Sequence, residues 1–172
     1  MFTDIHNCCM LLGTADDILI LCHKSPDGDT IGAAYGLYHA LTQLGRRAAV
    51  RCSDPLPEKF AYIHGGIEMP EFEPQLIIAV DIAGPGLLGP ALEQYADRVD
   101  LCIDHHVSNS DYAKLTLLDA QAAAACEVMT SVIRHLGVPL TKPMADALFT
   151  GHHRRTGIED DVADGLGAGS GG

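Results

Sequence analysis

The sequence has no run of about 18 consecutive apolar residues, the length that a helix needs to cross a bilayer. Its first ten residues, MFTDIHNCCM, include an aspartate and no lysine or arginine, so they lack the basic start of a secretory signal peptide. We therefore expect neither a signal peptide nor a membrane-spanning segment. These absences favour a soluble protein of the cytoplasm.

Basic residues are scarce: Lys and Arg together number 11 against 23 Asp and Glu, which gives a formal net charge of −12. Such a surface repels the phosphate backbone of nucleic acids, which argues against sequence-independent binding to duplex DNA. A phosphate ester can still bind where a local cation compensates its charge. Because basic side chains are so few, a bound metal ion is the obvious source of that cation.

The six cysteines show no C-x-x-C spacing, the pattern typical of zinc sites and redox pairs. Three of them, Cys22, Cys52 and Cys102, lie within or beside apolar segments that resemble strands. In a chain of this length without a secretion signal, we expect buried free thiols rather than disulfides or a zinc site.

Short apolar segments alternate with helical patterns along the chain. The expected strands are 17–21, 47–52, 76–80, 98–103 and 114–118, and the expected helices are 30–45, 90–96, 119–137 and 141–151. Strands that are apolar almost throughout and alternate with helices favour an α/β fold, with a parallel sheet flanked by helices on both faces.

The ends of the helices and of the domain also have signals in the sequence. Asp119 is the expected N-cap of helix 119–137, and Gly137 is its expected C-cap. We expect one domain over residues 1–151. From residue 157 the chain becomes acidic and then glycine-rich, and we expect an atypical tail without a stable fold over residues 152–172.

Acidic residues and histidines follow three of the expected strands. The segment HKSPDGD after strand 17–21 contributes His23, Asp27 and Asp29. Asp81 directly follows strand 76–80, and the triplet DHH at 104–106 directly follows strand 98–103. Ligands of parallel sheets bind in the crevice beyond the carboxyl ends of the strands, so we expect the three clusters to meet there.

Each cluster also has a simpler interpretation. A Pro-Asp-Gly sequence is usually only a turn, an aspartate after a strand often caps the next segment, and neighbouring histidines are often solvated. Three such clusters at three strand ends are more than these interpretations predict. Pro26 and Gly28 allow a tight turn that directs Asp27 and Asp29 into one site, and Gly32 allows close helix packing.

Four carboxylates gathered in one crevice repel one another, which raises some of their pKa values unless a cation neutralises them. Carboxylates and imidazoles without thiolates suit Mn²⁺, Mg²⁺, Fe²⁺ or Zn²⁺. Asp27, Asp29, Asp81 and Asp104, with up to three histidines, exceed the needs of one ion. Two ions about 3.5–4 Å apart and bridged by a carboxylate would use them all, and would suit hydrolysis of a phosphate ester.

The motifs HKSPDGDTIG, Asp81 after LIIAV, and DHH at 104–106 resemble, in order and spacing, the first three motifs of the DHH phosphoesterase family. Within the family the chain resembles the RecJ-like nanoRNases that also act as 3'-phosphoadenosine 5'-phosphate phosphatases, over about residues 4–151. The resemblance implies a Rossmann-like DHH domain and a substrate that is a short oligoribonucleotide or 3'-phosphoadenosine 5'-phosphate. Because related chains are often dimers, it also implies a homodimer.

The resemblance implies two manganese ions and assigns their ligands, although Mg²⁺ or another divalent ion would suit the same residues. His23, Asp27 and Asp81 match the ligands of one ion. Asp29, Asp81 and His105 match those of the second, so that Asp81 bridges the two.

The other members of the triplet receive catalytic roles from the resemblance. Asp104 matches a residue that orients a histidine of the triplet, and His106 matches one that contacts the scissile phosphate. The implied reaction is in-line attack of water on phosphorus, assisted by the ions. Its products would be mononucleotides, or AMP and phosphate.

The chain departs from the family's pattern after Gly151. Family members continue with a motif G-x-x-x-D-T-G, whose aspartate completes the second metal site, whereas this chain reads GHHRRTG with Arg155 in that position. A guanidinium cannot coordinate a metal. The family's second domain, whose Gly-Gly-Gly-His motif grips the nucleotide, is not found in this sequence.

A frameshifted or misjoined end after Gly151 would explain these departures. Codons for His152, His153 and Arg154, read one nucleotide later, can spell Thr-Thr-Asp, as expected near the fourth motif. The coding DNA tests this hypothesis, because a downstream frame without a DHH-family second domain would contradict it.

Three functions stay open on the sequence. The first is a manganese-dependent phosphoesterase domain that is weak or inactive because it is truncated. The second is a non-catalytic remnant that binds metal or nucleotide, and the third is a related pyrophosphatase or cyclic-dinucleotide phosphodiesterase. The metal-ligand motifs cannot separate these substrates, because the second domain would choose among them.

Overall fold

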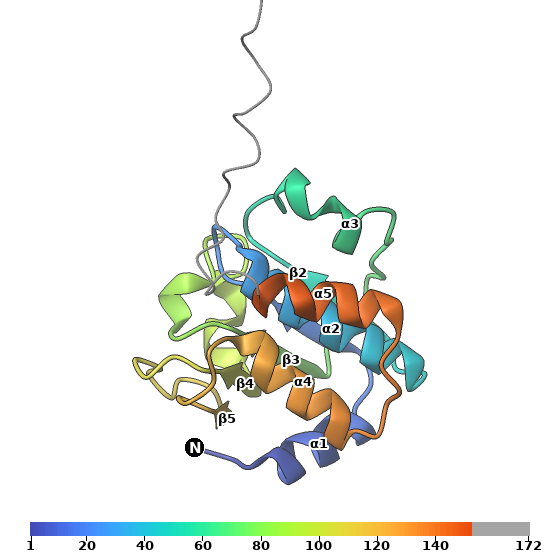
Figure 1. The fold of residues 1–172 in the computed structure, drawn as a ribbon. Coiled ribbons are helices and arrows are strands. Elements are labelled where there is room, and N and C mark those ends of the chain that lie inside the picture. Colours follow the sequence, from blue (N-terminus) through green and yellow to red (C-terminus); the bar gives the residue numbers. More distant parts are fainter. Residues whose placement is uncertain (153–172) are drawn as a thin grey trace, which may run out of the picture.

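The computed structural model describes residues 1–152, which form a five-stranded parallel sheet with helices around it (Figure 1). The sheet order is β2-β1-β3-β4-β5. The strands are β1 (Ile18–Leu21), β2 (Ala48–Arg51), β3 (Leu76–Val80), β4 (Leu101–Asp104) and β5 (Leu115–Leu118). The helices are α1 (Ile5–Thr14), α2 (Gly28–Gln43), α3 (Ala61–His64), α4 (Ala125–His135) and α5 (Lys142–His152), with 3₁₀ segments η1 (Glu58–Phe60), η2 (Pro85–Leu87) and η3 (Glu93–Arg98). Arg155 and the rest of the expected tail from residue 153 onward lie outside the described residues.

The central strands are buried on both faces, which explains why they are apolar throughout. Every residue of β1, β3 and β4 is buried. Because side chains alternate across a strand, β1 sends Ile18 and Ile20 into one hydrophobic cluster and Leu19 and Leu21 into another. The sheet therefore separates two cores.

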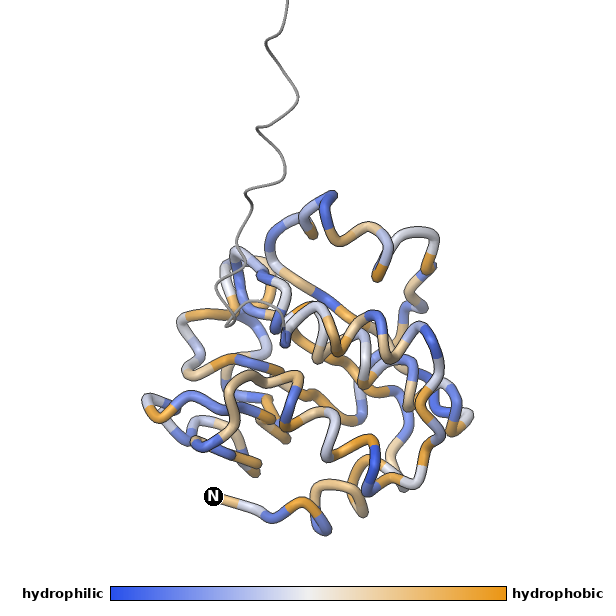
Figure 2. The backbone as a smooth tube through the Cα atoms, viewed as in Figure 1, coloured by the Kyte–Doolittle hydropathy of each residue, from blue (hydrophilic) through white to orange (hydrophobic). Residues whose placement is uncertain are grey.

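The two faces are covered differently. The first core holds buried residues of α1, α2, α4 and α5, and the last three of these helices lie side by side over the sheet (Figure 1). The second core is closed by the segment 82–99 through Ile82, Leu88, Leu92 and Val99. The hydropathy along the helices alternates (Figure 2), although α2 is buried on all sides over residues 28–37. The predicted α/β parallel-sheet fold is confirmed.

On the second face the helical elements are short. The predicted helix over 90–96 is replaced by the 3₁₀ segment η3, and η2 precedes it. The segment from 84 to 90, GPGLLGP, consists mostly of glycine and proline, and both residue types disfavour an α-helix interior. The prediction of an α-helix at 90–96 was therefore wrong.

Helix α4 begins six residues later than predicted, at Ala125. Asp119 is not its N-cap: the Asp119 side chain accepts a hydrogen bond from the Gln121 amide at 3.0 Å within a turn. The N-cap is Ala124, whose side chain makes no capping bond. The helix ends at His135 and its C-cap is Leu136, one residue before the predicted Gly137, which follows with the left-handed angle φ +69°.

Helices α2 and α5 approach each other closely at Gly32, as predicted. A Cβ atom on Gly32 would lie 2.3 Å from the carbonyl oxygen of Ala147, so any side chain there would separate the helices. The six cysteines are free thiols, as expected, and Cys8, Cys22, Cys102 and Cys126 are buried. None of the helices between residues 1 and 152 is long and apolar enough to cross a membrane.

Candidate metal centre

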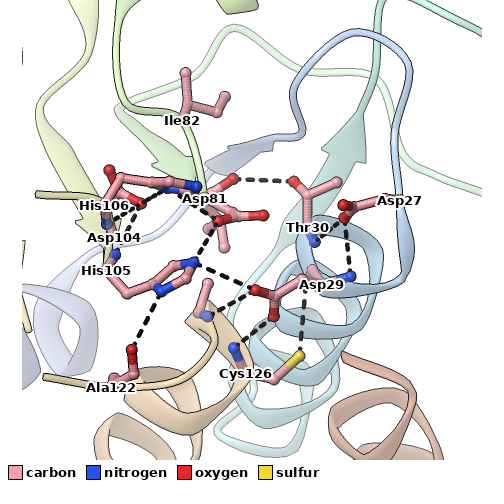
Figure 3. A network of polar contacts seen from close by, with 12 residues as sticks. Asp27, Asp29, Thr30, Asp81, Ile82, Asp104, His105, His106, Ala122 and Cys126 are labelled. Atoms are coloured by element: carbon pink, nitrogen blue, oxygen red, sulfur yellow. Dashed lines mark hydrogen bonds and ion pairs between the residues drawn. The ribbon is translucent and has the colours of Figure 1, made fainter. Parts of the chain in front are cut away.

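The predicted site residues meet at the carboxyl edge of the sheet, beside the neighbouring strands β1 and β3. Figure 3 labels all of them except His23. From β1 the chain runs outward to β2 in one direction, and from β3 to β4 and β5 in the other. This is the topological switch point at which open α/β sheets bind ligands. The residues that the structure brings together there are His23, Asp27, Asp29, Asp81, Asp104, His105 and His106.

Asp81 lies at the centre of the site. It follows β3 directly, is 4% exposed, and has the left-handed backbone angle φ +61°. Its Oδ1 atom is buried and has no hydrogen-bond partner. The pKa of Asp81 is raised to about 6, mainly by burial; the interaction with His105 opposes the rise, and the charges of Asp29 and Asp27 add to it. A buried carboxylate oxygen without a partner is costly, and a cation would relieve that cost.

His23 and Asp27 form one side of the site with Asp81. The Nε2 atom of His23 lies 3.7 Å from Asp27 Oδ1 and 3.7 Å from Asp81 Oδ2. The Nδ1 atom of His23 is 2.7 Å from the carbonyl oxygen of Lys24, which can only accept. We therefore assign the proton to Nδ1, which leaves the lone pair of Nε2 facing the two carboxylates.

The turn before α2 fixes Asp27. Its Oδ1 atom accepts hydrogen bonds from the amides of Asp29 (3.0 Å) and Thr30 (3.2 Å), so Asp27 is the N-cap of α2. The hydroxyl of the fully buried Thr30 donates to the carbonyl oxygen of Val80 at 3.0 Å and so ties the turn to the end of β3. Although burial lowers the pKa of His23, Asp27 and the Lys24 carbonyl outweigh this effect and hold it above its ordinary value.

His105 and Asp29 lie on the opposite side of Asp81. The Nε2 atom of His105 is 3.5 Å from Asp81 Oδ1 and 3.6 Å from Asp29 Oδ2. Its Nδ1 atom lies 3.3 Å from the carbonyl oxygen of Ala122, which again leaves Nε2 with the lone pair. Asp81 is the main reason that the pKa of His105 lies above its usual value.

Asp29 is held by a helix that is distant in the sequence. Its Oδ2 atom accepts the amide of Ala125 at 2.8 Å, and its Oδ1 atom accepts the amide of Cys126 at 2.9 Å (Figure 3). These are the first two residues of α4, whose amides would otherwise lack partners. Asp29 thus provides the cap that we had assigned to Asp119.

Asp104 orients His106. The side chain of Asp104 is fully buried, and its Oδ1 atom accepts from His106 Nδ1 at 2.8 Å and from the amide of His105 at 2.8 Å. Its Oδ2 atom accepts from Asn109 Nδ2 at 2.6 Å. The His106 ring is 43% exposed, and the bond at Nδ1 leaves Nε2 available to a ligand.

The donor atoms fall into two groups that share Asp81. In each group every residue offers one ligand atom, and these atoms lie within 4.8 Å of one another: His23, Asp27 and Asp81 form the first group, and Asp81, His105 and His106 the second. Ligand atoms around an ion with bonds of about 2.0–2.2 Å lie roughly 3–3.5 Å apart, close to the separations of 3.5–3.7 Å between the paired imidazole and carboxylate atoms. The oxygen and nitrogen donors fit hard or borderline divalent cations. Asp29 is not in the second group, although its carboxylate faces His105.

Several residues that support the site were not predicted from the sequence. Asn109, Thr30 and the carbonyl of Ala122 position predicted site residues by hydrogen bonds. Asn109 follows the DHH triplet closely, which is a usable signal. The contacts of Thr30 and Ala122 depend on the tertiary fold and leave no mark in the local sequence.

Comparisons with known proteins identify the family of this chain. Residues 17–152 match the family described as "DHH family, N-terminal domain". A relative from Thermus thermophilus, the "Bifunctional oligoribonuclease and PAP phosphatase NrnA", is 32% identical over 146 residues, or 81% of this chain and 43% of the relative. A relative from Streptococcus mutans, the "Probable bifunctional oligoribonuclease and PAP phosphatase NrnA", is 26% identical, and the match covers 79% of this chain and 44% of the relative.

A solved structure shows the same fold. The crystal structure of an exopolyphosphatase-related protein from Bacteroides fragilis superposes with a TM-score of 0.76 at 22% identity, over 86% of this chain and 48% of that one. The chain therefore spans somewhat less than half the length of the relatives that it matches. The family match covers most of the chain, and this chain belongs to the DHH family, whose N-terminal domain it contains.

Proposed function

We propose that this chain is the metal-binding catalytic domain of a phosphoesterase that hydrolyses short oligoribonucleotides or 3'-phosphoadenosine 5'-phosphate with Mn²⁺. The observation that carries the proposal is Asp81, a buried carboxylate shared by two groups of potential metal ligands. A carboxylate between two cation sites is the arrangement of two-metal phosphoesterases.

Two of the ligands are prepared for a cation before it binds. His23 and His105 each direct an Nε2 lone pair at Asp81, because a backbone carbonyl holds the proton on the other ring nitrogen. In our proposal His23, Asp27 and Asp81 hold one Mn²⁺, and Asp29, Asp81 and His105 hold the second. In the structure it is His106 that lies within ligand distance of Asp81 and His105. The proposed assignment therefore requires Asp29 to replace His106 as a ligand of the second ion.

The bound ions would lower the pKa of the attacking water and offset the charge of the phosphoryl oxygens. The Nδ1 atom of His106 donates to Asp104, so Nε2 is the ring nitrogen left to contact the scissile phosphate, to which it would donate when it also carries a proton. Asn109 keeps Asp104 in place by its bond to Oδ2. Since Asp104 is fully buried, the His106 ring has a defined orientation before substrate arrives.

The proposed substrates come from the names of the relatives, which describe oligoribonucleases and PAP phosphatases. The chain spans 43–44% of those proteins, so their activity is a proposal for this chain. A homodimer and a cytoplasmic location stay predictions. A non-catalytic remnant, a pyrophosphatase and a cyclic-dinucleotide phosphodiesterase are the alternatives that an assay must separate.

The test is turnover by the purified chain with Mn²⁺. A 5'-labelled diribonucleotide, 3'-phosphoadenosine 5'-phosphate, pyrophosphate and a cyclic dinucleotide are supplied separately, and AMP, mononucleotides or phosphate are measured. Asp81→Asn is the matched control, because asparagine tolerates the left-handed backbone at this position better than alanine does. The Asp81→Asn substitution also removes the negative charge of the carboxylate that is proposed to bridge the two ions.

We expect weak turnover of the first two substrates by the wild-type chain, which spans less than half of its relatives, and none by the control. Equal rates for the two chains would contradict the proposal, as would turnover of pyrophosphate or the cyclic dinucleotide alone. Mn²⁺ binding without turnover of any substrate would favour the non-catalytic remnant.

A further inference from the structure

Gly151, in the last turn of α5, lies against the carboxylate of Asp29. A Cβ atom on Gly151 would lie 2.7 Å from Asp29 Oδ1, 2.3 Å from Cys126 Sγ and 2.9 Å from Cys126 Cβ. Cβ atoms in proteins essentially never approach other heavy atoms so closely. The position therefore has no room for any side chain as long as Asp29 and Cys126 keep their places.

Neither neighbour can move away freely. The Sγ atom of Cys126 also faces Gly32, where a Cβ atom would lie 2.9 Å from it, so the thiol is packed between two glycines. Asp29 is bonded through both oxygens to the first two amides of α4. A side chain at position 151 would therefore push against the bonded end of the Asp29 carboxylate.

We propose that Gly151 is a positioning residue: by having no side chain, it lets the Asp29 carboxylate sit on the start of α4 and face His105. Restoring ordinary van der Waals contact to a Cβ atom at 151 would require Asp29 Oδ1 to retreat by several tenths of an ångström. Such a shift would lengthen the bond to the Cys126 amide and change the 3.6 Å approach of Oδ2 to His105 Nε2. His23 and Asp27, on the other side of Asp81, would keep their geometry.

The hydrogen bonds between Asp29 and the start of α4 do not depend on metal. The consequence of these bonds for binding of the second Mn²⁺ rests on the proposed function. The two can therefore be measured separately, by amide exchange without metal and by Mn²⁺ titration.

The test compares Cys126→Gly with the double variant Cys126→Gly, Gly151→Ala. The single variant removes the thiol and its Cβ atom, so that of the close neighbours of position 151 only Asp29 Oδ1, at 2.7 Å, remains. Adding the alanine then perturbs Asp29 without colliding with Cys126. Gly13→Ala is the control for adding a methyl group, because Gly13 is also the penultimate residue of a helix and has no heavy atom within 4 Å of its Cβ position.

In the metal-free protein we expect the double variant to lose about tenfold or more of the hydrogen-exchange protection at the Ala125 amide and the residue 126 amide, relative to Cys126→Gly. We expect the affinity for the second Mn²⁺, measured by calorimetry, to fall by about 10–100-fold while that for the first is kept. Gly13→Ala should change neither measurement.

Unchanged exchange at both amides would overturn the inference. Unfolding of the double variant under conditions in which Cys126→Gly folds would overturn it as well, because Gly151 would then serve the packing of α5 alone. A loss of amide protection in a chain whose wild type binds no Mn²⁺ would support the positioning of Asp29 and contradict the proposed function.

Discussion

Replacing Asp81 with asparagine is expected to stabilise the metal-free protein at pH 8 and to abolish most of its stabilisation by Mn²⁺. The carboxyl of Asp81 has its pKa raised from 3.8 to about 6, mainly by burial. Because the folded state prefers the protonated form, the ionised carboxylate destabilises the fold above pH 6, and the effect vanishes below the unfolded pKa near 4.

The size of the effect follows from the shift. About two pKa units correspond to about 3 kcal/mol. The side-chain amide of asparagine stays buried, and the position of Asp81 Oδ1 offers it no hydrogen-bond partner. Part of this gain in stability is therefore offset. We therefore expect a net gain in the free energy of unfolding of about 1–2 kcal/mol at pH 8, shrinking as the pH falls from 6 to 4.

Urea denaturation of both chains, with EDTA and with Mn²⁺, provides the assay. Mn²⁺ at about 100 times its Kd should add about 2.7 kcal/mol to the wild type and little to Asp81→Asn, so that the order of stability reverses. A variant that is less stable than the wild type without metal at pH 8 would refute the reasoning from burial. Equal stabilisation of both chains by Mn²⁺ would refute the role of Asp81 in binding.

Three further substitutions test the surroundings of the site. His106→Asn keeps a donor for Asp104, so its free energy of unfolding should change by less than about 1 kcal/mol while kcat falls about 10²-fold or more; an unchanged kcat would remove His106 from the reaction. Asp104→Asn would turn an amide group toward the donors of His106 or Asn109, and its unfolding free energy in urea should fall by about 2–4 kcal/mol. Gly32→Ala would place Cβ 2.3 Å from the carbonyl oxygen of Ala147, so thermal denaturation should show a loss of about 2–3 kcal/mol; a gain, as helix propensity alone predicts, would contradict the close packing.

The strand positions and the site were predictable because both follow from local patterns. β3 coincides with the apolar run LIIAV, and the strands on either side of it also lie within one to three residues of their predicted ends. Open parallel sheets bind ligands beyond the carboxyl ends of their strands, so a polar residue that directly follows a buried strand is a candidate for the crevice. Asp81 could therefore be placed in the site from the sequence alone.

The errors arose where distant contacts decide the local structure. Asp119 has the composition of an N-cap, but Asp29 binds the amides of Ala125 and Cys126, and the helix begins at that point. No local signal relates Asp29 to residues nearly a hundred positions away. Gly151 was noted only as part of a motif, since its closeness to Asp29 depends on how α5 packs against α2.

The most direct measurement of whether Asp81 joins two cation sites is electron paramagnetic resonance of the chain titrated with Mn²⁺. We predict that the wild-type chain binds two ions whose spectra show exchange coupling through a shared ligand, and that Asp81→Asn loses this coupling. Two magnetically isolated ions, or a single ion whose binding is unchanged by Asp81→Asn, would contradict a shared Asp81.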